Sequence, residues 1–165
     1  MAELTNLESK LGEVTGLAMA AQGATDKVKG LAKEEGQNDL VSLLERMHRE
    51  AAETEERCTD LAGSLDGKKT AILEKARETE AEAEDMMSTY LGDDAEGLDG
   101  FEFVTMAEAG EVGHWAILAK LNERAGEPRI SELVDWALPI QERHFAAVKD
   151  GSLKLASEED PAAAS

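Results

Sequence analysis

Hydrophobic residues recur every three or four positions along most of the chain, which is the spacing of one face of an α-helix. In residues 38–62 this apolar stripe consists of Leu40, Leu44, Met47, Ala51, Thr54, Cys58 and Leu61. No run of alternating β-branched and polar residues lies between turn residues, so no strand is expected. The pattern predicts five helical segments, at about residues 4–33, 38–62, 68–91, 101–125 and 128–150.

Turn residues separate these segments and predict how they connect. Gly126 and Pro128 stand between the last two segments, which is the usual pairing of a C-terminal glycine with an N-terminal proline. Short connections between long amphipathic helices favour antiparallel neighbours. We therefore expect an all-α fold, an antiparallel bundle of four or five helices, as a single domain over residues 1–150. Residues 151–165 are expected to form a disordered C-terminal tail.

The first segment differs from the others in its glycines, which are Gly12, Gly16, Gly23 and Gly30. Each glycine costs about 1 kcal/mol relative to alanine inside a helix. Such residues either permit the close approach of a neighbouring helix or mark a break, and the sequence leaves both possibilities open.

Composition and charge restrict the class of protein. The 165 residues include 36 acidic and 17 basic ones, which gives a formal charge of −19. This balance opposes binding to nucleic acid or to an anionic membrane surface, because both require a basic face. The apolar stretches are shorter than a membrane span of about 20 residues, and the first residues lack the features of a signal peptide. With Cys58 as the single cysteine, a cytoplasmic location is expected.

Three histidines suggest a metal site. Two of them belong to Glu-x-x-His units, and such a unit points a carboxylate and an imidazole the same way on a helix. The candidate metal ligands pair a carboxylate with a nearby histidine and are Glu45 with His48, Glu111 with His114, and Glu142 with His144. Di-iron and di-manganese bundles use the same unit, together with single glutamates from partner helices.

The histidines are predicted to lie at similar heights in the bundle. In an antiparallel hairpin, facing residues sum to twice the centre of the turn. The turn near residue 127 therefore places Glu111 opposite position 143, next to His144. The other turns place His48 opposite Glu84 and close to Asp26, and Glu84 in turn lies near position 108.

The apolar stripes predict that these histidines also face inward. In residues 101–125 the expected stripe consists of Phe103, Ala107, Gly110, His114, Ile117 and Leu121. His48 lies beside Leu44 and Met47, and His144 lies between Ala137 and Val148. Buried carboxylates and imidazoles require protons, partners or a metal ion.

Residues 43–57 (LLERMHREAAETEER) and 102–126 (EFVTMAEAGEVGHWAILAKLNERAG) resemble the ferritin-like superfamily, which includes rubrerythrin-like and small stress-associated bacterial bundle proteins. Residues 130–145 are compatible with the last helix of that family. The resemblance implies a carboxylate-bridged iron or manganese site, with oxidation of Fe(II) or removal of peroxide in stress protection, and a homodimer or another protein partner. It implies that Glu45, His48, Glu111 and His114 are ligands, with Glu142 and His144 matching more loosely.

The chain also departs from this family pattern. The first segment offers Gln22 and Asp26 where a glutamate is expected, and Gln141 rather than Glu142 shares a helical face with His144. Five helices exceed the four of the family core. Either the third segment is an insertion into a core made by the other four, or the fifth is an appendage to the first four.

Two alternatives to a di-metal protein follow from these departures. One is a non-catalytic ferritin-like scaffold or interaction bundle with a degenerate metal site. The other is a three-histidine site for zinc, nickel or iron. A metal site predicts that the three histidines converge and are shielded from solvent. A scaffold predicts that they diverge or are exposed, and that an exposed apolar patch marks a binding surface.

Overall fold

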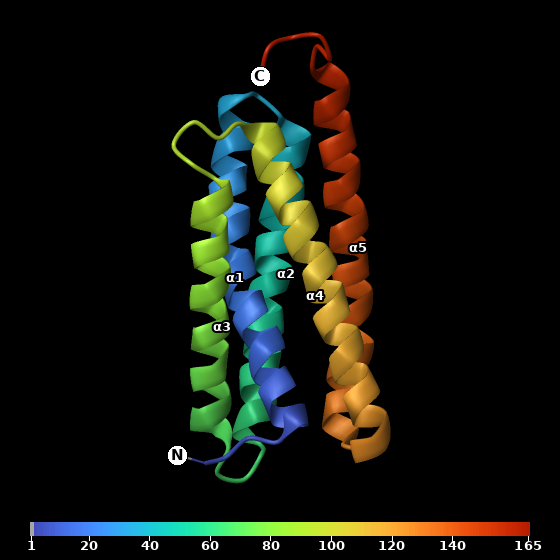
Figure 1. Ribbon diagram of the computed structural model, residues 1–165. Helices are drawn as coiled ribbons and strands as arrows, with labels where there is room; N and C mark the ends of the chain where they lie inside the picture. Colours follow the sequence, from blue (N-terminus) through green and yellow to red (C-terminus); the bar gives the residue numbers. More distant parts are fainter. Residues whose placement is uncertain (1) are drawn as a thin grey trace.

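The computed structural model describes residues 2–165, which form five α-helices and no strand. The helices are α1 (Asn6–Glu34), α2 (Asn38–Gly63), α3 (Lys69–Tyr90), α4 (Gly97–Ala125) and α5 (Pro128–Glu158). The prediction of an all-α bundle is confirmed (Figure 1). In the described part of the chain, every helix is too short or too polar to span a membrane.

Four of the helices form the core of the bundle. Helix α1 packs against α2 and α4, and α5 packs against the same two helices, which closes a ring of antiparallel neighbours. Helix α3 lies outside this ring, mainly against α1, and carries the chain back to the end of the bundle where α4 begins (Figure 1). Of the two arrangements left open by the sequence, the structure shows the one in which the first, second, fourth and fifth helices form the core and the third lies outside it.

Glycines of α1 allow α3 to approach closely. A Cβ atom on Gly12 would lie 2.9 Å from the backbone oxygen of Ile72, and one on Gly16 would overlap the backbone oxygen of Ala76. Gly23 and Gly30 face open space instead. The first two glycines therefore serve close packing, and none of the four breaks α1.

The interior consists of two hydrophobic clusters with a polar layer between them. One cluster contains Leu11, Cys58 and Trp115, and lies toward the α4–α5 turn. The other contains Phe101 and Val148, and lies toward the α1–α2 turn. The polar layer, at the middle of α2, α4 and α5, consists of Glu50, Glu108, Glu111, Gln141 and His144.

Helix α5 is longer than the sequence suggested. It continues to Glu158, so the expected tail boundary at residue 150 is corrected, and Gly151 and Leu155 are buried. A Cβ atom on Gly151 would lie 2.5 Å from a ring carbon of Phe101. This glycine ends no helix, because its missing side chain makes room for the aromatic ring. Residues 159–165 are exposed.

Candidate functional site: a polar layer and an apolar pocket

The buried stripe of α4 differs from the one that the sequence predicted. The buried residues include Phe101, Val104, Glu108, Glu111, Trp115, Leu118 and Asn122. Gly110 and Ile117 of the expected stripe are exposed, and His114 is half-buried. The prediction was wrong because two of the buried positions carry carboxyl groups, which a search for apolar periodicity counts as surface. The true orientation brings Glu108 and Glu111 into the bundle.

His144 of α5 lies between carboxylates of two other helices. Its Nε2 atom is 3.2 Å from Oε2 of Glu50 on α2, and its Nδ1 atom is 3.5 Å from Oε2 of Glu108 on α4. The imidazole is only 3% exposed. Each ring nitrogen thus faces a carboxylate on a different helix, so the histidine links α5 with α2 and α4.

Gln141, one turn before His144, extends this network to Glu111. With its nitrogen turned toward α4, the Gln141 amide donates to Oε2 of Glu108 at 2.9 Å and to Oε2 of Glu111 at 3.2 Å. Burial, and next the nearby charge of Glu108, raise the pKa of Glu111 well above its usual range. The polar layer therefore favours a proton on Glu111.

The other two histidines lie at the edges of the bundle and have partners of their own. The Nδ1 atom of His48 is 3.1 Å from the backbone oxygen of Gln22 and 3.4 Å from Oδ1 of Asp26. The Nδ1 atom of His114 is 3.3 Å from Oε2 of Glu13 on α1. Their side chains are 36% and 38% exposed, respectively. The three histidines thus contact three different sets of residues.

The structure brings two of the six predicted ligands into the polar layer. These are Glu111 and His144, whereas Glu45 and Glu142 are exposed. Within residues 2–165, no group of three or more histidine, cysteine, aspartate or glutamate side chains is arranged to hold one metal ion.

The sequence reasoning missed three members of the layer. Gln141 shares a helical face with His144, and position 108 was the height predicted to face Glu84, so both had a signal. Nothing in the sequence distinguished Glu50 from the other charged residues of the same helix.

A pocket of about 190 Å³ lies between α1, α3 and α4. Its walls are mainly alanine, methionine and other apolar side chains, including Phe103 and Met87. Glu108 and Glu111 contribute to the inner wall. Met86 and Met106 also line it and are 51% and 41% exposed, so the pocket opens to solvent.

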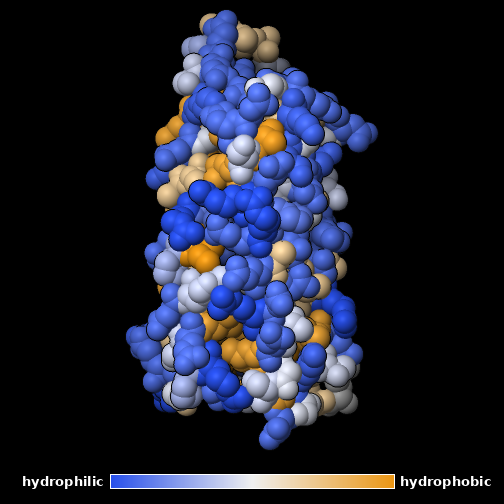
Figure 2. Space-filling view, turned by 180° about the vertical axis from the view of Figure 1, so that it is seen from behind, coloured by the Kyte–Doolittle hydropathy of each residue, from blue (hydrophilic) through white to orange (hydrophobic). Residues whose placement is uncertain are grey.

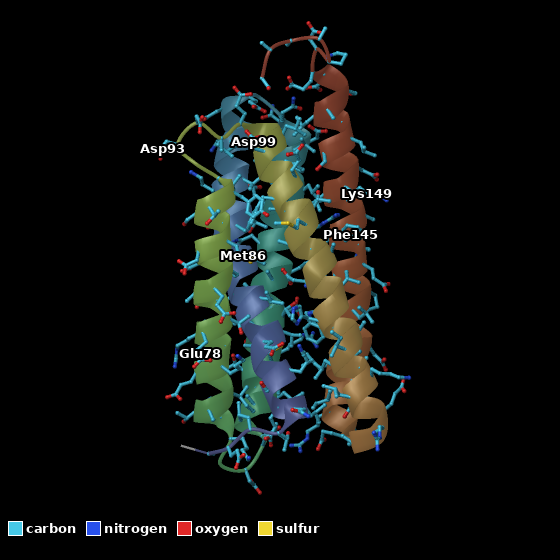
Figure 3. All side chains as sticks on the ribbon, viewed as in Figure 1. Glu78, Met86, Asp93, Asp99, Phe145 and Lys149 are labelled. Carbon is cyan, nitrogen blue, oxygen red and sulfur yellow. The ribbon has the colours of Figure 1, made fainter. Side chains whose placement is uncertain are left out.

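The three helices that line the pocket are labelled in Figure 1, and Met86, one of its lining residues on α3, is labelled in Figure 3. The opposite side of the molecule is mostly hydrophilic, with scattered apolar spots (Figure 2). Phe103 is buried, as predicted, and it also lines the pocket. Ala107, Gly110 and His114 of the predicted stripe line the pocket as well, and they are partly or fully exposed, so this face of α4 is only partly covered by the bundle.

Cys58 adds no reactive group to the polar layer or to the pocket. It is fully buried in α2, and burial raises the pKa of its thiol to about 12. A thiol that stays protonated is a poor nucleophile and a poor metal ligand.

Comparison with protein-family models, with curated proteins and with solved structures gave no match for this chain.

Proposed function

We propose that this protein is a non-catalytic binding bundle with a ferritin-like chain path and a degenerate metal site. The observation that carries this proposal is the separation of the histidines. His48 and His114 pair with α1 at the edges, and His144 has a carboxylate at each ring nitrogen. The apolar pocket beside α4, which opens to solvent at Met86 and Met106, supports the second part of the proposal, that the protein acts by binding.

The chemistry of the polar layer supports the loss of a metal site. Ferritin-like bundles place carboxylates and histidines from four helices around their ions. At the corresponding height, the inward positions of α1 carry Ala18 and Ala21, and those of α2 carry Met47 and Ala51. Alanine has no ligand atom, and the methionine thioether is a poor ligand for Fe(II) or Mn(II). The carboxylate that α2 adds to the layer, Glu50, lies against His144. The polar residues of α4 and α5 are instead joined by hydrogen bonds from the Gln141 amide, and the raised pKa of Glu111 favours a proton on that carboxyl group.

A second candidate is the ferritin-like iron or manganese protein that the sequence resembles, with Fe(II) oxidation or peroxide removal as its activity. Glu108, Glu111 and His144 support it, because they present two carboxyl groups and an imidazole from α4 and α5 in the middle of the bundle. In this case the ions would be held by half of the usual ligand set, and Gln141 would have to turn its oxygen toward them.

Metal loading distinguishes the two candidates. Protein purified without a histidine tag is stripped with a chelator, reloaded with Fe(II) in air or with Mn(II), and analysed for metal content. Our proposal predicts no more bound metal than in a Glu111→Gln, His144→Ala double variant, and iron oxidation no faster than in buffer. One or two ions per chain, lost in that variant but retained in Glu45→Gln, would contradict it.

A further inference from the structure

We propose that the pocket between α1, α3 and α4 binds a compact hydrophobic ammonium ion, whose apolar body fills the pocket and whose charge pairs with Glu111. This inference rests on the proposed function, because a metal ion held by Glu108 and Glu111 would occupy the same carboxyl groups. It assigns the class of ligand that the binding bundle takes.

The size of the pocket sets the size of the ligand. An apolar cavity of about 150 Å³ is large enough for benzene. The volume here is about 190 Å³, and the opening beside Met86 leaves room for a substituent. A single aromatic ring with a short side arm therefore fits, and a long lipid chain does not.

The side chains that line the pocket can adapt to apolar groups of different shapes. Met86, Met87 and Met106 contribute flexible, polarisable side chains, which adapt to different ligands and contact aromatic rings favourably. Phe103 adds a ring to the same wall. Among the described residues no lysine or arginine lines the pocket, and its basic residue, His114, lies beside Glu13, so carboxyl groups dominate the charge of the lining.

The charge of the pocket favours a cation. Glu108 and Glu111 are each 3% exposed, and Gln141 is the amide that donates to both. Glu84 of α3 adds a third carboxyl group to the lining. Two acidic groups buried side by side repel each other when both are ionised, and an ammonium ion between them and the apolar wall removes that repulsion. The formal charge of −19 opposes an anionic ligand.

Ligand binding is coupled to a proton. Burial raises the pKa of Glu111, which favours the protonated carboxyl group in the empty pocket. When the ammonium ion enters, Glu111 becomes a carboxylate and its proton passes to solvent, so the ligand stays protonated and charge is conserved. The titratable and charged groups that the neighbouring helices place in this region are Glu108 of α4, Glu50 of α2, His144 of α5, Glu84 of α3, and His114 of α4 with Lys10 and Glu13 of α1.

Three probes of one shape test the inference by titration calorimetry. They are 2-phenylethylammonium, the neutral 2-phenylethanol and the anionic 3-phenylpropanoate. The expected result is binding of the ammonium ion at least tenfold tighter than that of the alcohol, and no binding of the anion. Titrations in two buffers of different ionisation enthalpy should show release of up to one proton per ammonium ion bound. Equal affinity for all three probes, or no proton release at neutral pH, would overturn it.

Two pairs of variants locate the site. Glu111→Gln should weaken ammonium binding at least tenfold and leave the alcohol unchanged, whereas Glu45→Gln on the exposed side of α2 should change neither. Gly110 lines the pocket and Gly113 does not, and a Cβ atom meets nothing at either position. Gly110→Leu should therefore abolish binding while Gly113→Leu preserves it. If the wild-type protein binds neither 2-phenylethylammonium nor a metal ion, the ligand inference is wrong and the proposed function stands. If it binds iron or manganese stoichiometrically, the proposed function is wrong as well.

Discussion

Glu50 on α2 and His144 on α5 are joined across the bundle, with Nε2 of the histidine 3.2 Å from Oε2 of the glutamate. The opposite nitrogen of the same ring faces Glu108 on α4 at 3.5 Å. This contact lies between the two hydrophobic clusters. The ring thus cross-links three helices in the middle of the bundle.

Removal of this ring should destabilise the fold. His144→Ala leaves Glu108 buried without its imidazole partner, and the expected loss in the free energy of unfolding is about 2–4 kcal/mol. His114→Ala is the matched control, because that ring is half-exposed and should cost less than about 1 kcal/mol. Urea unfolding followed by circular dichroism measures both. Equal losses of unfolding free energy in the two variants would show that the buried contacts of His144 stabilise the fold no more than the half-exposed contact of His114.

The stability of the protein should depend on the protonation of Glu111. Burial raises the pKa of this carboxyl group in the folded state, so the folded chain holds the proton more tightly than the unfolded chain. Its contribution to stability is most favourable below the unfolded value of about 4.3 and decreases as pH rises toward the folded value. The loss amounts to about 1.4 kcal/mol for each pH unit within that window.

Glu111→Gln tests this dependence. The amide keeps the shape of the carboxyl group and donates to Glu108 without ionising, so the variant should be more stable than wild type at pH 8. The difference between the two proteins should shrink as the pH is lowered toward 5. Glu45→Gln, on the solvent side of α2, should track wild type at every pH. A difference that does not change with pH would show that Glu111 has an ordinary pKa.

The close contact between α1 and α3 should tolerate no side chain at Gly16. A methyl group there overlaps the backbone oxygen of Ala76, so Gly16→Ala must push α3 away, at an expected cost of about 1–3 kcal/mol. Gly23→Ala in the same helix meets open space and should gain roughly 0.5–1 kcal/mol from helix propensity. Thermal unfolding compares them. If both substitutions shift the unfolding temperature in the same direction, Gly16 is not required for the close packing of α1 against α3.

The last two turns of α5 should contribute to stability. A chain ending at Asp150 loses the buried Leu155 and the contact of Gly151 with Phe101, and the leucine alone accounts for about 2–3 kcal/mol. A chain ending at Glu158 removes only exposed residues and should match the full-length protein within about 0.5 kcal/mol. If the two truncated chains were equally stable, residues 151–158 would contribute nothing to the fold, and the prediction would be wrong.

The heights of residues along the bundle could be predicted from the sequence, because turns fix how antiparallel helices face each other. His48 lies beside Asp26, as expected from the turn near Gly36. Glu111 lies opposite Gln141, two positions from the predicted residue 143. The buried stripe of α2 was also predicted correctly, because its inward residues are mostly apolar.

The rotation of α4 about its own axis could not be predicted in the same way. Periodicity identifies a buried face by its apolar residues, but the buried face of α4 carries two carboxyl groups, whereas Ala107 and Ile117 of the predicted stripe are partly or largely exposed. The candidate site was therefore predicted at the correct height with two of its members, Glu111 and His144, whereas Glu50, Glu108 and Gln141 were missed. Only the packing of α4 against α5 shows which of the two faces is inside.

We propose that the three histidines do not share a metal ion, and nuclear magnetic resonance with Mn(II) can distinguish a shared ion from separate rings. Because the chain has three histidines, their ring signals can be assigned with three single variants. With one equivalent of Mn(II) at physiological salt, we predict that the His144 signal keeps its width while the exposed rings of His48 and His114 broaden only slightly. Strong broadening of all three signals together at one equivalent would contradict the account and restore the shared metal site.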